Sequence, residues 1–417
     1  MEKIIVDGLF KIFGAHPEKA LSLLKKGHTK EDILTKTGLT VGVNNAGFTI
    51  SQGEIFVIMG LSGSGKSTMV RMLNRLIEPT KGRVIVDGHE VTALSRKELV
   101  KFRLHHMSMV FQSFALMPHL SVLENAAFGL KLAGVPPAKL RERAMQALDQ
   151  VGLSGWEHSF PSQLSGGMQQ RVGLARGLAV DPDILLMDEA FSALDPLIRT
   201  EMQDELLKLQ ESHQRTIVFI SHDLDEALRI GDRIAIMEGG RVVQVGTPEA
   251  ILQHPANDYV RAFFRGVDPT NVISAGDIVR DTYPTIIKTR AGSLRAAHEL
   301  LSSSELDHGY VLDVDHRFLG IVTSDSLREA IEAGQKDNPI DQAFLDNVET
   351  VNLDDSMQDI LPEVASKSWP VPVVDDTNKY KGVVSKKRFL KTLHRTEKVI
   401  EGQVPENKAP ADAAPGH

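Results

Sequence analysis

Residues 60–67, Gly-Leu-Ser-Gly-Ser-Gly-Lys-Ser, constrain the fold of this 417-residue chain more than any other stretch. Their spacing, G-x-x-x-x-G-K-S, lets glycines turn the backbone so that successive N–H groups point at one anion. The apolar run at residues 54–59 is typical of a buried parallel strand, and residues 68–76 have helical spacing. A strand before the loop and a helix after it aim the helix N-terminus at a phosphate. The sequence therefore predicts an α/β fold with a phosphate-binding loop.

Composition argues against several classes of protein. The chain has no cysteine, which excludes disulfides, thiolate nucleophiles and cysteine-based zinc sites. A formal net charge of −8 argues against a nucleic-acid binder held by bulk positive charge. The N-terminus lacks a secretory pattern, and no apolar run approaches the roughly 18–20 residues that span a bilayer. We therefore expect no nucleic-acid partner, and we expect contact with a membrane only through another subunit.

Three further apolar runs, which have the character of buried strands, end in polar side chains. Those side chains are Gln112, the pair Asp188 and Glu189, and His222. Between the first two runs, residues 164–171 (Leu-Ser-Gly-Gly-Met-Gln-Gln-Arg) open a helical pattern. Taken singly, an acidic pair is usually a solvated strand end and a histidine is usually a surface residue. Their order along one chain after a phosphate-binding loop favours a shared site instead.

This ordered set resembles the ATP-binding subunit of an ABC transporter over roughly residues 3–265. The resemblance implies a P-loop NTPase of the ABC ATPase type, with a RecA-like core and a helical subdomain at about 113–180. Ala190 departs from the family pattern, because many members place proline there. The insertion between Phe13 and Val43, together with residues 111–119 and 187–196, is similar to the ATPase subunits of glycine betaine/proline betaine importers.

The resemblance implies ATP and Mg²⁺ as cofactors and gives roles to the matching residues. The nucleotide-binding residues would be Phe13, Gly60, Ser62, Gly63, Ser64, Gly65, Lys66, Ser67, Thr68 and Gln112. Lys66, Glu189 and His222 would be catalytic, with Glu189 polarising the attacking water and His222 contacting the γ-phosphate. Ser67, Gln112 and Asp188 would hold the metal. Phe13 would stack on adenine, and simple core packing stays open as its alternative.

The family pattern also implies that one chain does not complete a site. Ser165, Gly166, Gly167 and Gln169 would form a signature that faces the ATP of a second copy, with an anion site at the start of their helix. The implied unit is a head-to-tail homodimer with ATP between the subunits and Asp195 at the seam. A membrane permease would dock near residues 114–123, whose apolar side chains could equally belong to the core of the helical subdomain.

The C-terminal third contains a weak internal repeat of about 60–65 residues, each copy formed by a helix, a strand, an acidic turn, a strand and a helix. It resembles a tandem CBS module at 276–395, in halves of about 276–334 and 339–395, after a linker at 266–275. Residues 396–417 are polar and are expected to be a disordered tail. Many CBS modules bind adenosine compounds through an aspartate, but the matching positions here are Ser326 and Arg388. A structural or regulatory role is therefore expected for the module.

Residues 386–395 form the most basic patch of the C-terminal third, with Lys387, Lys391 and Arg395 at helical spacing. This face could contact anionic lipid headgroups, and a simple solvated helix face is the alternative.

We expect a peripheral ATPase subunit at the cytoplasmic face of the inner membrane that drives osmoprotectant import, with a substrate-binding protein as an indirect partner. The alternatives are a non-transport ABC ATPase and a ligand-sensing regulator centred on the CBS module.

Overall fold

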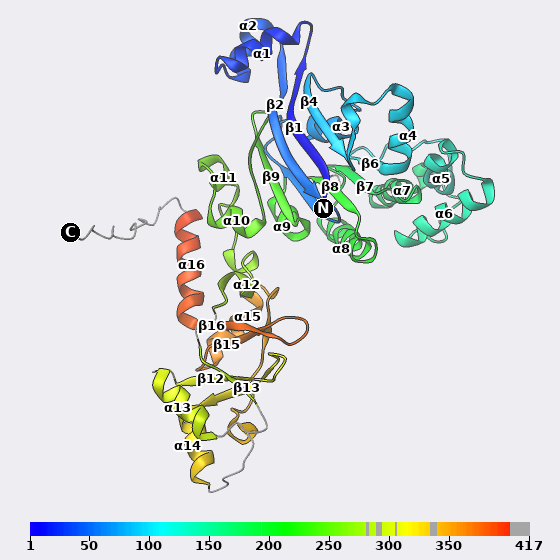
Figure 1. The fold of residues 1–417 in the computed structure, drawn as a ribbon. Helices are drawn as coiled ribbons and strands as arrows, with labels where there is room; N and C mark the ends of the chain where they lie inside the picture. Colours follow the sequence, from blue (N-terminus) through cyan, green and yellow to red (C-terminus); the bar gives the residue numbers. More distant parts are fainter. Residues whose placement is uncertain (193, 281–282, 289–293, 305–306, 334–339, 401–417) are drawn as a thin grey trace. The chain divides into compact units, whose positions relative to one another are not determined.

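The computed structural model describes residues 1–192, 194–280, 283–288, 294–304, 307–333 and 340–400 (Figure 1). The chain divides into two compact units. The first comprises Met1–Ile251 and Pro255–Phe263, and the second comprises Leu252–His254 and the chain from Phe264 onward. The sequence predicts that the first domain ends at residue 265, and the last segment of the second unit begins one residue earlier, at Phe264.

A six-stranded sheet forms the centre of the first unit, in the order β10-β9-β3-β8-β7-β6. Its strands are β3 (Ile55–Met59), β6 (Met107–Phe111), β7 (Ile184–Asp188), β8 (Thr216–Ile220), β9 (Arg233–Glu238) and β10 (Arg241–Gly246). All neighbours are parallel except β9 and β10. Every residue of β3, β7 and β8 is buried, as continuous apolar runs predict for parallel strands covered on both faces. The carboxyl ends of β3, β8, β7 and β6 therefore meet at one edge.

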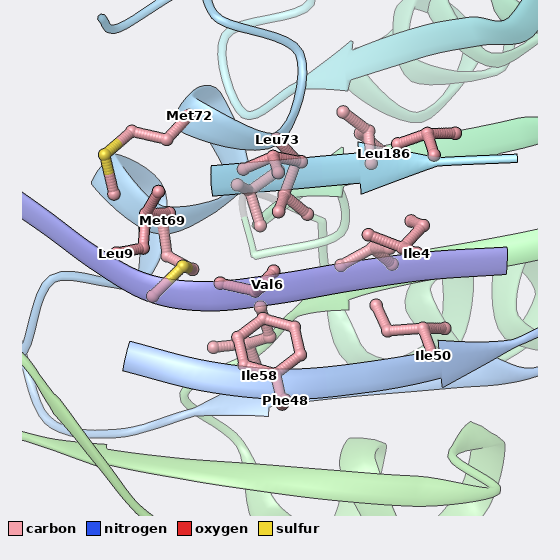
Figure 2. Packing of buried hydrophobic residues seen from close by; sticks show 14 of the residues in the cluster. Ile4, Val6, Leu9, Phe48, Ile50, Ile58, Met69, Met72, Leu73 and Leu186 are labelled. Carbon is pink, nitrogen blue, oxygen red and sulfur yellow. The ribbon is translucent and has the colours of Figure 1, made fainter. Parts of the chain in front are cut away.

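A four-stranded antiparallel sheet packs over the first, in the order β2-β1-β4-β5. Its strands are β1 (Glu2–Phe13), β2 (Thr40–Ser51), β4 (Lys81–Val86) and β5 (His89–Glu90). Helix α3 (Lys66–Leu73) follows the phosphate-binding loop. In Figure 2, side chains of β1 and β2 lie opposite Met69, Met72 and Leu73 of α3 and form one buried cluster with Ile58 and Leu186. This core fixes the loop between β3 and α3.

The remaining helices of the first unit include two separate groups, the insertion and the helical subdomain. Helices α1 (Pro17–Lys25) and α2 (Lys30–Thr37) form the insertion, and Thr29 caps α2 in a capping box with Asp32. The other helices are α4 (Arg96–His106), α5 (Val122–Leu132), α6 (Pro137–Gln150), α7 (Gly166–Ala179), α8 (Pro196–His213), α9 (Leu224–Ile230), α10 (Pro248–Gln253) and α11 (Asp258–Phe263), with short 3₁₀ turns at Val91–Ala93 and Pro161–Gln163. The last two residues of α10, 252–253, belong to the second unit. Helices α5, α6 and α7 pack on one another and form the helical subdomain.

The second unit contains the same motif twice. One copy comprises β11 (Thr285–Ile287), α13 (Leu294–Ser304), β12 (His308–Leu312), β13 (Phe318–Thr323) and α14 (Ser324–Glu332). The other comprises β14 (Val351–Asn352), α15 (Met357–Ser366), β15 (Val371–Val374), β16 (Tyr380–Val384) and α16 (Lys386–Ile400). Each sheet has one parallel and one antiparallel pair, in strand order. The two copies join through reciprocal backbone hydrogen bonds, Phe318 N to Asn378 O (3.0 Å) and Tyr380 N to His316 O (3.0 Å).

Two expectations for this unit need correction. The stretch 266–275 contains a 3₁₀ turn (Pro269–Asn271), and its Ile273 and Ala275 are fully buried before α12 (Ala275–Ile278), so it is packed structure and not a free linker. Residues 396–400 belong to α16, where Thr396 and Ile400 are buried, because the amphipathic face of this helix continues past residue 395. The rest of the expected tail, 401–417, lies outside the described residues.

Candidate nucleotide-binding site

The phosphate-binding loop follows β3 directly, as the sequence predicts. Gly60 has φ 151°, and a Cβ there would collide with the backbone oxygen of Met237, so only glycine fits. Lys66, at the start of α3, is 5% exposed and donates from Nζ to Gly60 O (2.7 Å) and Leu61 O (3.3 Å). Burial lowers the pKa of Lys66, and the carboxylates of Glu189 and Asp188 oppose that shift. A bound anion would give this ammonium a stronger partner than two carbonyls.

Ser64 gives the loop a second group without a partner. Its Oγ is buried and forms no hydrogen bond among the described atoms. Buried hydroxyls are nearly always satisfied, so an orphaned one inside a phosphate loop fits a missing ligand. Ser62 and Ser64 also line an open cleft of about 530 Å³, together with Lys30 of the insertion and Arg241. The insertion therefore lies beside the loop, which the sequence alone does not indicate.

Glu189 lies where the strand ends converge. Its Oε2 accepts from Gln112 Nε2 (3.1 Å) and is 3.8 Å from Nδ1 of His222, and its Oε1 is 3.9 Å from Lys66 Nζ. Its φ of 48° is uncommon for a residue with a Cβ, and the turn is held by Ser192 Oγ, which donates to Glu189 O (2.9 Å). Such a backbone conformation is typical of functional sites. Residues that follow three strands, β6, β7 and β8, thus meet the phosphate-loop lysine around one carboxylate.

Asp188 has a partner that the sequence interpretation missed. Arg71 contacts the same Asp188 oxygen, Oδ2, through Nε (3.0 Å) and through a terminal nitrogen (2.9 Å). The Asp188 side chain is 3% exposed, so this ion pair balances a buried charge. Arg71 lies four residues after Ser67, one turn further along α3, and this spacing was the signal that could have identified it.

Phe13 is the last residue of β1 and its side chain is exposed. A Cβ on Gly42 would lie 2.8 Å from the Phe13 ring and 3.4 Å from the methyl group of Thr68. The Phe13 ring and helix α3, which carries Thr68, therefore both lie next to Gly42. Lys11 Nζ lies 5.0 Å from the ring centroid. An exposed aromatic ring beside the phosphate loop is suitably placed to stack on a base.

The signature residues lie at the start of α7. Ser165 is the N-cap and accepts from Met168 N (3.3 Å), and Gly166 is exposed. Gly167 allows a close approach of α8, because a Cβ there would lie 2.7 Å from Ile198. Among the described residues, no hydrogen bond or ion pair joins this helix start to the phosphate loop.

Gln169 is engaged within its own subdomain. Its Nε2 donates to Pro161 O (3.0 Å) and Leu164 O (3.2 Å) and holds the segment before α7 in place. The proposed docking face is partly internal too. Val122 is fully buried, so for this residue the alternative of a place in the core of the helical subdomain is confirmed.

Asp195 is exposed and caps α8, accepting from Ile198 N (3.1 Å). One turn later, Arg199 donates to Asp223 Oδ2 (3.2 Å), next to His222. Helix α8 therefore connects the segment around Asp195 to the segment around His222.

A second link from α8 is buried. Gln203 donates to Glu226 Oε1 (3.1 Å), and Glu226 Oε2 is in short contact with the hydroxyl of Ser221, the residue before His222. Burial raises the pKa of Glu226, against the two hydrogen bonds that favour its ionised form. The sequence interpretation missed Ser221, Gln203 and Glu226, because nothing in their spacing shows that α8 and α9 meet.

This sheet edge, with its phosphate loop, carboxylate pair, histidine and separate signature helix, defines an ATP-binding cassette. A family model described as ABC transporter matches residues 43–192, and one described as CBS domain matches residues 342–395. A solved dimeric structure of a bacterial ABC transporter cassette is 33% identical, with a TM-score of 0.51, over 58% of this chain and 98% of that one.

Two curated relatives extend the match beyond the cassette. The glycine betaine/proline betaine transport system ATP-binding protein ProV of Salmonella typhimurium is 56% identical over 94% of this chain and 98% of its own length. The glycine betaine transport ATP-binding protein OpuAA of Bacillus subtilis is 47% identical over 96% and 94%, respectively. The chain belongs to the family of ATP-binding subunits of glycine betaine ABC transport systems, and it is an ATPase. In the described part of the chain, no helix combines the length and apolar character of a bilayer span.

Proposed function

We propose that this chain hydrolyses ATP to drive the uptake of a glycine betaine or proline betaine type osmoprotectant through a membrane permease. The observation that supports it most is the meeting of Lys66, Gln112, Glu189 and His222 at one sheet edge, in a chain with full-length relatives named for this transport. A strand-end cluster of this kind suits in-line attack of water on a phosphate that the loop holds.

The residues divide the chemistry between them. Lys66 and the loop N–H groups hold the phosphates, and the unpartnered Ser64 hydroxyl donates to one of their oxygens. Glu189 orients the attacking water, and Gln112 holds its carboxylate by a hydrogen bond of 3.1 Å. His222, 3.8 Å from the same carboxylate, contacts the γ-phosphate and links it to the water. Phe13 stacks on the base.

The oxygen donors at the strand ends fit a magnesium ion. Asp188, Ser67 and Gln112 offer a carboxylate, a hydroxyl and an amide oxygen, which are the hard ligands that Mg²⁺ prefers. A bound ion would supply positive charge to the phosphates. Arg71 holds the Asp188 carboxylate in place, because it contacts Oδ2 through two nitrogens.

A second copy of the chain completes the site. Among the described residues, no hydrogen bond or ion pair joins Ser165, Gly166 or Gly167 to the phosphate loop of the same chain, and an exposed helix start attracts an anion. In a head-to-tail dimer these groups face the ATP of the partner subunit, and Asp195 lies at the seam. Helix α8, which Asp195 caps, then couples changes at the dimer interface to the position of His222.

The membrane role depends on partners. The proposed location is the cytoplasmic face of the inner membrane, where the chain binds a permease. A substrate-binding protein delivers the solute to that permease. The half-buried residues Phe114, Leu116 and Met117, which follow Gln112, offer the docking surface.

The test is reconstitution in vesicles with the membrane subunits that co-purify with the chain. We expect ATP-dependent uptake of glycine betaine or proline betaine, lost in Glu189→Gln and retained in Glu142→Gln, which removes an exposed carboxylate on α6. ATP hydrolysis with no co-purifying membrane subunit would favour a non-transport ATPase. Uptake of an unrelated solute alone would contradict the substrate assignment.

A further inference from the structure

One face of α16 lines a pocket in the second unit. Arg388, Lys391 and Arg395 follow the i, i+3, i+7 spacing that places side chains on one helix face. The pocket has a volume of about 100 Å³. Its other lining residues are Gln253, Asp277, Ile278, Thr392, Thr396 and Val399. The face expected from the sequence contained Lys387, which does not line the pocket, and lacked Arg388, which does.

The positive charge of this pocket is not balanced. Arg388 Nε is buried and has no hydrogen-bond partner among the atoms described. Within the described part of the chain, no carboxylate forms an ion pair with Arg388, Lys391 or Arg395. Asp277 lines the pocket, but its Oδ2 already accepts from the backbone N (2.9 Å) and the hydroxyl (2.8 Å) of Ser274.

Positively charged side chains also lie close to one another at this pocket. Burial lowers the pKa of Arg388, and the nearby guanidinium groups of Arg280 and Arg395 lower it further. An arginine stays protonated through such shifts, so the repulsion persists until an anion enters. A pocket of about 100 Å³ holds several water molecules, and therefore a group with the size of one tetrahedral oxyanion.

The first repeat provides an internal contrast. Ser326 occupies the position of Arg388, and its side chain completes a capping box with Thr323 at the start of α14. A serine whose hydroxyl is used by the helix cap leaves no charge to balance. The cationic pocket therefore belongs to the second repeat and does not follow from the shared topology.

We propose that this pocket binds a phosphate group, either free inorganic phosphate or the headgroup of an acidic lipid. Arg388 supplies the planar donor set that suits a phosphate, and Lys391 and Arg395 add charge from the next turns of the helix. The site lies in the second unit and shares no residue with the site assigned to ATP hydrolysis.

Hydrogen exchange of residues 386–400 in the full-length chain tests this. The exchange is followed during titration with inorganic phosphate at constant ionic strength, with ADP present to saturate the phosphate loop. We expect exchange to slow in the wild type. The phosphate concentration at half-effect should rise about tenfold or more in Arg388→Gln, which is the loss expected for one charge-assisted contact.

Lys387→Gln is the matched control, because it removes one exposed charge from the same helix outside the pocket. It should behave like the wild type. Lys391→Gln, at an exposed position, should weaken binding even if Arg388→Gln proves poorly folded. If Lys387→Gln and Arg388→Gln raise the phosphate concentration at half-effect equally, the attraction is diffuse and the proposal of a binding pocket is wrong.

Vesicle flotation separates the two sources of phosphate. Phosphatidylcholine vesicles with and without phosphatidic acid are mixed with the wild type and with Arg388→Gln. Binding to acidic vesicles that needs Arg388, without protection by free phosphate, identifies a lipid headgroup. Protection without vesicle binding identifies free phosphate. If the wild type gives neither signal, the proposal is wrong.

Discussion

Acidic residues end strands in both units, but they face different surroundings. At the end of β7, Asp188 pairs with Arg71, which is 117 residues away in the chain. Glu189, next to it, contacts Gln112 and Lys66. After β15 in the second unit, Asp375 Oδ1 accepts from backbone N–H groups two and four residues away, at 3.0 Å each.

The difference shows what makes a strand-end carboxylate functional. Asp375, like Asp313 after β12, satisfies its own turn and leaves little capacity for a ligand. The carboxylates at the end of β7 are instead held by side chains from other elements, among them Lys66 of the phosphate loop. A carboxylate at the end of a strand therefore indicates a site only when distant side chains hold it.

Neutralising the central carboxylate should have the largest effect. In Glu189→Gln we expect turnover to fall roughly 10²- to 10⁴-fold, because an amide is a poor acceptor for a proton from water. Nucleotide binding should survive and dimers should accumulate with ATP, which steady-state ATPase assays and gel filtration will measure. Turnover near that of the wild type would remove Glu189 from its role.

Lys66→Ala should weaken the binding of ATP. Losing one charge-assisted partner of the phosphates should weaken ATP affinity about 10- to 100-fold, measured by calorimetry. Lys139→Ala on α6 is the control, since it removes an exposed lysine far from the loop in sequence. Equal affinities in both variants would contradict the loop assignment.

Arg71→Met tests whether a distant partner really holds Asp188. Without the guanidinium, the buried carboxylate should be held less firmly and should bind metal less well, so the Mg²⁺ concentration at half-maximal ATPase should rise about tenfold or more. Arg71→Lys should recover part of this change, and a purely structural role would leave the magnesium titration unmoved.

Asp375→Asn should have the smallest effect and should spare ATPase activity. The hydroxyl of Thr377, followed by the Lys381 ion pair and backbone N–H groups, holds the pKa of Asp375 well below its usual range. A depressed pKa stabilises the fold above the pKa of the unfolded chain, about 3.9, and this stability is lost as pH falls below that value. We expect the melting temperature of the variant to be a few degrees below that of the wild type at neutral pH. This difference in melting temperature should disappear in acid.

Asp315→Asn, in the equivalent turn of the first repeat, is the control because Asp315 is exposed and contributes only its backbone N–H to that turn. A loss of ATPase activity in Asp375→Asn would break the contrast between the two units.

Local patterns in the sequence determined much of the fold. Apolar runs gave the buried strands β3, β7 and β8, the loop spacing located Lys66, and the repeated C-terminal motif followed from neighbouring residues. These features depend on periodicity and backbone conformation over a few residues, so they survive without tertiary information. The same reasoning failed for the packed stretch 266–275 and for the last turns of α16, where burial against other elements decides the structure.

Only the tertiary structure decided which side chains hold the site. The Arg71–Asp188 pair, the α8 links to the segment around His222, and the pocket at Arg388 each join elements brought together by strand order or helix packing. Contacts between residues so far apart in the chain depend on how the core packs, and no local period encodes that. The sequence therefore determined the chemical groups of this ATPase, while the packing of its core decided which of them meet.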